Sequence, residues 1–135
     1  MSYARQMLDA YPGTISIDAP VLAATIEALT DCAQACTADT DDDLSESNVN
    51  EMVTCIRLCL DCTDLCTSTV AIASRQREEL DITVFTPLLE SCAAICNSCA
   101  QECERHAHMH EHCRVCAEAC RRGEQATREL LAAMR

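Results

Sequence analysis

Thirteen cysteines dominate the chemistry of this 135-residue chain, and most of them follow one spacing. The segment "CIRLCLDCTDLC" (55–66) places four cysteines at intervals of four, three and four residues, and "CAAICNSCAQEC" (92–103) repeats that pattern. In an α-helix with 3.6 residues per turn, these intervals put all four side chains on one face. Each segment therefore predicts a helix with a stripe of sulfur along one side.

Two shorter groups, at 32–36 and 113–120, have the same helical period. Leu58, Leu65 and Ile95 flank the longer stripes, and a stripe bordered by Leu and Ile faces a core. We therefore expect four helices to point their thiols at one axis. The candidate metal ligands in this set are Cys32, Cys36, Cys55, Cys59, Cys62, Cys66, Cys92, Cys96, Cys99, Cys103, Cys113, Cys116 and Cys120.

Thiolates at this density suit a soft metal: Cu(I), zinc or an iron–sulfur cluster. Side chains at i and i+4 lie about 5–6 Å apart, and one two-coordinate metal with bonds of about 2.3 Å can link them. Zinc on four thiolates leaves two negative charges at every site, whereas Cu(I) on bridging thiolates leaves none to bury. This favours Cu(I), with about a dozen ions per chain. Uptake should weaken at low pH, because each ion displaces a thiol proton.

Other interpretations of the cysteines are less favoured. Buried cysteine can act as a small apolar residue, but Val or Ala would do so without the risk of oxidation. Disulfides are disfavoured because i,i+4 pairs in a helix are poorly directed for bridging. Catalysis is not expected, since no E-x-x-H pair of a di-iron bundle occurs and thirteen interchangeable thiols do not resemble one activated nucleophile. The alternative function is a metallothionein-like zinc or cadmium buffer, or an iron–sulfur carrier.

Composition limits the partners and the location. The net charge is −12 and every basic residue is Arg, which argues against nucleic acid or an anionic membrane as a partner. The N-terminal segment lacks the pattern of a secretory signal, and no stretch approaches eighteen consecutive apolar residues, so we expect no membrane span. Clustered cysteines in a cytoplasmic chain indicate metal rather than disulfides.

Helix-favouring residues are common, with two Gly and three Pro in the chain. Four helices of such length, joined by short links, predict an all-α, up-down antiparallel four-helix bundle. We expect one domain over residues 1–135, with 1–19 as an N-terminal extension or short helix. A single helix over 86–134 would be about 70 Å long, so we favour a turn near 107–111. The expected helices run over about 20–38, from Asp43 or Asn48 to about 77, from 86 to that turn, and from the turn to 134.

Capping residues support these boundaries. Asp18 or Ala19 is expected to precede the first helix, with Pro20 in its first turn. The acidic run 39–43 is interpreted as a solvated turn that also caps the next helix. Thr86 as N-cap and Pro87 at the first helical position are expected to start the third helix.

One end of the predicted bundle is rich in histidine. His106 and His110 continue the stripe of the third helix, His112 lies four residues before Cys116, and His108 faces away. Imidazole and thioether are weaker ligands for Cu(I) than thiolate, which suits capture at a mouth. The candidate ligands there are His106, His110 and His112, with Met52 and Met109 as sulfur ligands where copper is taken up.

The opposite end carries no cysteine in the sequence and should be closed by hydrocarbon. Asp61 and Asp64 lie off the cysteine stripe, so we expect them in solvent or at a subunit contact. The residues expected to close that end are Ile15, Ile17, Val70, Ile72, Phe85, Leu88, Leu130 and Leu131.

Together these features resemble the bacterial copper storage proteins. The doubled C-x3-C-x2-C-x3-C pattern, the groups at 32–36 and 113–120 and the His-rich turn carry the likeness, over about residues 20–134. The resemblance implies a four-helix bundle that stores many Cu(I) ions on cysteine thiolates, for copper homeostasis and detoxification. It further implies a cytosolic homotetramer with uptake at the His-bearing end. A copper chaperone is a candidate partner.

Overall fold

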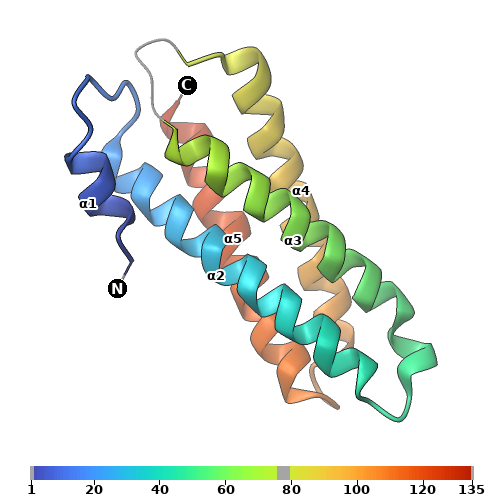
Figure 1. Ribbon diagram of the computed structural model, residues 1–135. Helices are drawn as coiled ribbons and strands as arrows, with labels where there is room; N and C mark the ends of the chain where they lie inside the picture. Colours follow the sequence, from blue (N-terminus) through green and yellow to red (C-terminus); the bar gives the residue numbers. More distant parts are fainter. Residues whose placement is uncertain (1, 76–79, 135) are drawn as a thin grey trace.

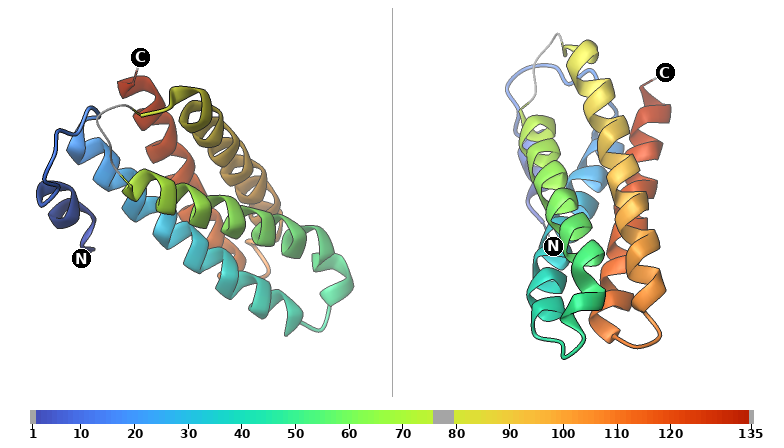
Figure 2. Two further views of the ribbon diagram at one scale, coloured as in Figure 1. Left: turned by 45° about the horizontal axis from the view of Figure 1, so that its top comes forward. Right: turned by 90° about the vertical axis from the view of Figure 1, so that its right-hand side faces the viewer.

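The computed structural model describes residues 2–75 and 80–134, and four long helices account for most of them (Figure 1). Helices that follow each other in the chain pack together, and the last packs on the first long helix, which closes the bundle (Figure 2). The predicted all-α up-down four-helix bundle is confirmed. The elements are α1 (Ala4–Asp9), α2 (Ala19–Leu44), the 3-10 helix η1 (Val49–Met52), α3 (Val53–Ser74), α4 (Ile82–His106) and α5 (Glu111–Ala133).

Two predicted boundaries agree with the structure. Asp18 caps α2, since its Oδ1 accepts a hydrogen bond from the Val21 N–H at 3.1 Å, and Pro20 lies in the first turn. The turn predicted near 107–111 separates α4 from α5. The α2–α3 connection and this turn lie at the same end of the bundle (Figure 1). The expected end of the second helix near Arg77 lies outside the described residues.

The predicted start of the third helix at Thr86 is wrong. Helix α4 begins at Ile82, and the Asp81 Oδ1 accepts from the Thr83 N–H at 3.0 Å. Pro87 is tolerated inside the helix because the only carbonyl that loses its N–H partner is that of Thr83, in the first turn. The additional turn also buries Phe85, which is 1% exposed.

The predicted turn over 39–43 is also wrong, because α2 continues to Leu44. Asp39 and Asp43 are buried, at 1% and 0% exposure. They lie three and seven residues after Cys36, so both fall on the inward face of the helix. Partners on other helices satisfy Asp39 there, and the acidic run is therefore helical rather than a solvated turn.

The core of the bundle has two parts. The larger part contains all thirteen cysteines with Leu29, Met52 and a few alanines. The smaller part is hydrocarbon around Leu22, Phe85 and Leu130, at the end away from the α4–α5 turn, and it includes every residue that was expected to close that end. The buried hydroxyls of Thr69 and Thr127 donate to carbonyls of their own helices, at 2.7 and 2.8 Å.

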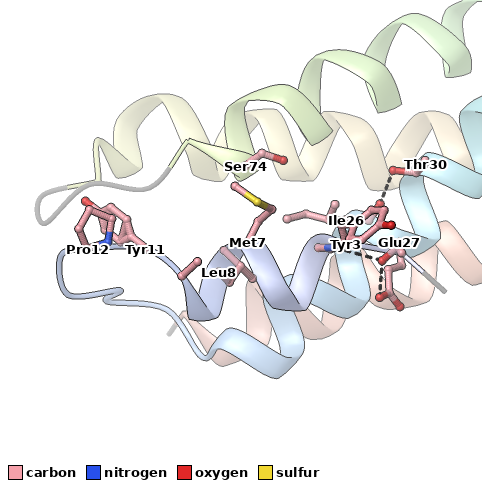
Figure 3. Close-up of a pocket in the computed structure, with 12 residues that line it drawn as sticks. Tyr3, Met7, Leu8, Tyr11, Pro12, Ile26, Glu27, Thr30 and Ser74 are labelled. Atoms are coloured by element: carbon pink, nitrogen blue, oxygen red, sulfur yellow. Dashed lines mark hydrogen bonds between the residues drawn. The ribbon is translucent and has the colours of Figure 1, made fainter.

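The short helix α1 packs against α2 and buries Leu8. Beside it lies a hollow of about 490 Å³ lined by residues such as Tyr3, Met7, Ile26 and Ser74 (Figure 3). None of its lining residues is a cysteine. The hollow is therefore separate from the sulfur-lined part of the core.

Helix α4 is long and apolar enough to cross a membrane, judged by length and composition alone. The core helix of a bundle has the same properties. Here α4 packs between α3 and α5, and its cysteines face the shared core.

Candidate metal centre

All thirteen predicted cysteine ligands are unpaired thiols inside the bundle. Twelve are 0% exposed and Cys116 is 1% exposed. Helix α2 provides two of them, α3 and α4 provide four each, and α5 provides three. The helical periodicity read from the sequence therefore predicted the direction of every thiol correctly.

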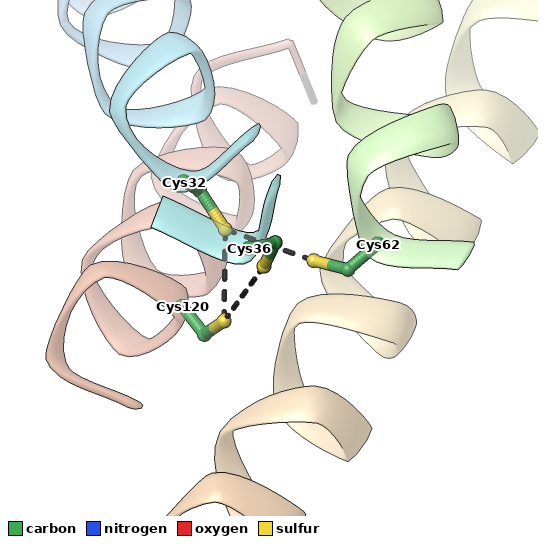
Figure 4. Close-up of side chains that lie close together, drawn as sticks. All are labelled: Cys32, Cys36, Cys62 and Cys120. Carbon is green, nitrogen blue, oxygen red and sulfur yellow. Dashed lines mark hydrogen bonds between the residues drawn. The ribbon is translucent and has the colours of Figure 1, made fainter. Parts of the chain in front are cut away.

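The thiols of different helices are in direct contact. The Cys32 Sγ lies 3.7 Å from those of Cys62 and Cys120, and the Cys36 Sγ lies 3.6 Å from that of Cys120 (Figure 4). A disulfide would need about 2.05 Å, whereas a metal with two sulfur bonds in line spans about 4.6 Å. Movements of less than about 1 Å would thus admit a bridging metal.

These contacts continue along the bundle axis as overlapping groups of four cysteines. In each group, all four sulfur atoms lie within 4.8 Å of one another. Each group shares two cysteines with the next group along the axis, so the sulfur lining is continuous rather than divided into isolated sites. The groups are Cys32/Cys36/Cys62/Cys120, Cys32/Cys62/Cys66/Cys96, Cys36/Cys99/Cys116/Cys120 and Cys59/Cys99/Cys103/Cys116.

Packing of the thiols also controls their protonation. Hydrogen bonding to Cys116 and burial raise the pKa of Cys36 above its ordinary value. Hydrogen bonding to Cys32 and burial do the same to the pKa of Cys66. In the metal-free protein these two thiols therefore hold their protons, and a metal that binds Cys36 or Cys66 must displace the proton of that thiol.

Asp39 closes the sulfur lining on the histidine side, a role that the sequence analysis missed. Its Oδ2 accepts from the thiols of Cys55, Cys59 and Cys103 at 3.4–3.7 Å. Its Oδ1 lies 2.5 Å from the His112 Nδ1. Burial raises the pKa of Asp39 to about 6. A carboxylate oxygen of Asp39 and the sulfur atoms of Cys55, Cys59 and Cys103 all lie within 4.8 Å of one another.

Asp43 lies one turn further along α2. Its Oδ1 is 3.6 Å from the Cys113 Sγ and 3.6 Å from the His112 Nδ1. Burial raises the pKa of Asp43 to about 8. The signal that could have identified both carboxylates is the spacing: Cys32, Cys36, Asp39 and Asp43 follow the same intervals of four, three and four as the cysteine repeats.

The histidines differ in their surroundings. The His112 ring lies against Asp39 and Asp43 through Nδ1. Its Nε2 lies 3.1 Å from the Glu46 Oε1. Although burial opposes it, hydrogen bonding to Asp39 and Glu46 raises the pKa of His112. The His110 ring stacks on that of His112 with centroids 5.3 Å apart. We refer to the end formed by Asp43, Glu46, His110 and His112 as the mouth.

The other predicted residues differ in how deeply they are buried. The His106 Nε2 lies 2.8 Å from a carboxylate oxygen of the buried Glu102, and His108 is exposed. Met52 is fully buried in the cysteine part of the core, while Met109 is 60% exposed on the rim. Asp61 and Asp64 are exposed. Which of the histidines and methionines bind metal stays a prediction.

The fold and the site define a class of protein: a helical bundle lined with thiolates that can hold several soft metal ions in one array. Residues 19–132 match the copper storage protein family, and the chain belongs to that family. The family expected from the sequence is thereby confirmed. It is a family of storage proteins and not of enzymes.

Three similar proteins illustrate the family. The chain is 48% identical to the Streptomyces lividans copper storage protein loaded with ten copper equivalents, with a TM-score of 0.93 over 96% of this chain and 98% of that one. A second structure, of copper loading to a cytosolic copper storage protein from Streptomyces lividans with five coppers, is 52% identical with a TM-score of 0.81, covering 84% and 93%. The uncharacterized cysteine-rich protein YhjQ of Bacillus subtilis (strain 168) is 36% identical over 71% of this chain and 82% of its own.

Proposed function

We propose that this chain stores and sequesters many Cu(I) ions on its cysteine thiolates and thereby serves copper homeostasis and detoxification. The continuous series of overlapping cysteine groups is the observation that carries the proposal. Isolated zinc sites would need separate groups of ligands, whereas shared sulfurs suit Cu(I) bridged by thiolates. The copper-loaded Streptomyces lividans relative supports the same cargo. No catalytic step is included in the proposal.

The metal set comprises all thirteen cysteines, and His106, His110 and His112 are further metal ligands at the mouth. Met52 and Met109 are proposed to assist where copper is taken up. Two-coordinate Cu(I) with bridging thiolates would give about one ion per sulfur, or about a dozen in total. Such an array neutralises the thiolate charge inside the bundle.

The setting of the protein follows from its relatives and is part of the proposal. The Streptomyces lividans protein is described as cytosolic, and we place this chain in the cytoplasm as well. The family resemblance supports a homotetramer of one-domain subunits and a copper chaperone as donor or acceptor. Sedimentation equilibrium of the full chain would determine the oligomeric state.

Anaerobic titration of the reduced protein with Cu(I), in competition with a chromophoric chelator, tests the stored cargo. We expect saturation at about a dozen ions per chain. Saturation at one to four ions would contradict storage and favour isolated zinc or iron–sulfur sites. Cys62→Ser should lower the capacity by about one ion, whereas Asp61→Asn, at the exposed neighbouring position, should leave it unchanged.

A further inference from the structure

We propose that the end of the core at the mouth binds one Zn²⁺ ion when copper is absent. This site is additional to the storage function and uses two carboxylates together with His112 and Cys113, which the proposed function also counts among the copper ligands. Four ligand atoms from two helices converge there: the Oδ1 atoms of Asp39 and Asp43 on α2, and the His112 Nδ1 and Cys113 Sγ on α5. Zinc in proteins is bound by these residue types.

The spacing of these atoms fits a tetrahedral ion. With zinc bonds of about 2.0–2.1 Å to nitrogen or oxygen and about 2.3 Å to sulfur, tetrahedral ligands lie about 3.3 Å apart, or about 3.6 Å when one is sulfur. The Cys113 Sγ lies 3.6 Å from both the Asp43 Oδ1 and the His112 Nδ1. The Asp43 Oδ1 lies 3.6 Å from the His112 Nδ1. Of these four contacts, the one between Asp39 and His112, at 2.5 Å, must lengthen by less than about 1 Å.

Asp43 provides an independent sign of a cation. Its side chain is 0% exposed, and its Oδ2 has no hydrogen-bond partner within residues 2–75 and 80–134. A buried carboxylate oxygen without a partner is strongly unfavourable. A divalent ion bound through Oδ1, or through both oxygens, would balance the negative charge of this carboxylate, to whose Oδ2 the described residues donate no hydrogen bond.

Charge and ligand type distinguish this ion from the stored copper. Two carboxylates, one thiolate and a neutral imidazole carry three negative charges, so Zn²⁺ would leave one charge unbalanced and Cu(I) would leave two. Carboxylates also suit harder and borderline ions, whereas Cu(I) selects soft sulfur ligands. In the copper-free protein, this ligand set therefore suits a divalent ion.

The surroundings orient the imidazole for this role. The His112 Nε2 lies 3.1 Å from the Glu46 Oε1, so that an Nε2–H can donate to the carboxylate while Nδ1 offers its lone pair to the metal. A ligating histidine usually donates its other ring N–H to such a partner. His110, stacked on the His112 ring, restricts its rotation further.

The test adds one equivalent of Zn²⁺ alone to the reduced, metal-free full chain and measures X-ray absorption at the zinc edge. We expect one sulfur and three nitrogen or oxygen ligands. A first shell of four sulfur atoms would place the ion in the cysteine interior and overturn the proposal.

Competition with a chromophoric zinc chelator tests the ligands. Asp43→Asn should weaken the affinity for the first zinc equivalent by at least about tenfold. Even residues that only hydrogen-bond to a ligand typically contribute about 10–100-fold to metal affinity. Asp41→Asn, at an exposed position of the same helix, should bind as the natural chain does. Unchanged affinity in a helical Asp43→Asn variant would refute the site. Cu(I) capacity of that variant, titrated separately, reports on the storage function independently.

Discussion

Burial sets the chemistry of the two inward-facing carboxylates, Asp39 and Asp43. Both occupy positions where the other helices present cysteine, and both have raised pKa values because the charged form loses its water. Asp39 obtains thiol and imidazole partners, while one oxygen of Asp43 has none in the part of the chain that the structure describes. Burial therefore favours the protonated, uncharged form of both side chains in the folded state.

The first prediction concerns pH. Unfolded aspartate has a pKa near 3.8, whereas burial raises the pKa of Asp39 to about 6 and that of Asp43 to about 8 in the fold. Between these values the folded state holds protons that the unfolded state has released, so stability falls as pH rises. We expect the free energy of unfolding of the metal-free protein to drop by at least about 1 kcal/mol from pH 5.5 to 7.5. Urea unfolding under reductant measures it.

The raised pKa of His112 acts in the same direction, because its folded state also retains a proton to higher pH. Asp43→Asn serves as the control, since the amide does not titrate and the pH dependence should become shallower. A metal-free protein that gains stability over this pH range would show that the buried carboxyls are ionised in the fold.

At the scale of the elements, α5 combines a sulfur stripe with one glycine at its centre. A Cβ at Gly123 would lie 3.4 Å from the Cys32 Cβ, the Cys96 Sγ and the Leu29 Cδ2. Those are ordinary contact distances, so alanine fits in the metal-free protein. Glycine inside a helix is less favourable than alanine by about 0.5–1 kcal/mol, and its presence here leaves room beside the Cys96 sulfur.

Gly123→Ala should therefore raise the stability of the metal-free protein and lower its capacity for copper. We expect the metal-free variant to gain about 0.5–1 kcal/mol in urea unfolding and to lose on the order of one bound copper in the Cu(I) titration, because the methyl group fills space that a metal on Cys96 would use. Gln125→Gly, exposed on the same helix, should lower stability without changing capacity. Full copper capacity in Gly123→Ala would show that the space beside the Cys96 sulfur has no role in copper binding.

At the scale of the whole molecule, the bundle holds together through two different halves. The cysteine half is proposed to bind metal, whereas the hydrocarbon half around Phe85, Leu89 and Leu130 is packed without it. Burial of such side chains contributes about 1.5–3 kcal/mol each. The hydrocarbon half can therefore keep the helices assembled while the thiols are empty.

The third prediction is that the metal-free protein keeps its helical circular-dichroism signal. Phe85→Ala should lower its free energy of unfolding by about 3–5 kcal/mol and leave the copper capacity of the folded variant unchanged, since Phe85 touches no part of the sulfur lining. Loss of the helical signal when copper is stripped from the natural chain would instead show that metal is required for folding.

The sequence predicted the features that depend on periodicity. Intervals of three and four residues placed all thirteen thiols on inward faces, because the geometry of the helix fixes which side chains share a face. The hydrocarbon end followed from the absence of cysteine there, and the turn before Glu111 followed from the length that a single helix over 86–134 would have. Local capping also identified Asp18 correctly.

Features that depend on partners from other helices were not predicted, although the spacing of Asp39 and Asp43 after Cys36 would have placed both on the inward face. Aspartate is a weak helix former that favours caps and turns, so the acidic run 39–43 was interpreted as a turn, although Cys55, Cys103 and His112 provide its partners inside the bundle. His106 continues the sulfur stripe in sequence, yet its nearest charged partner is Glu102.

By itself, the sequence determined the direction of the cysteines and thus a sulfur-lined bundle for copper. The tertiary structure alone decided that two carboxylates complete this lining and that one histidine joins them at the mouth. The physical reason is that periodicity is a property of one helix, whereas the stability of a buried charge depends on groups that only folding brings within bonding distance.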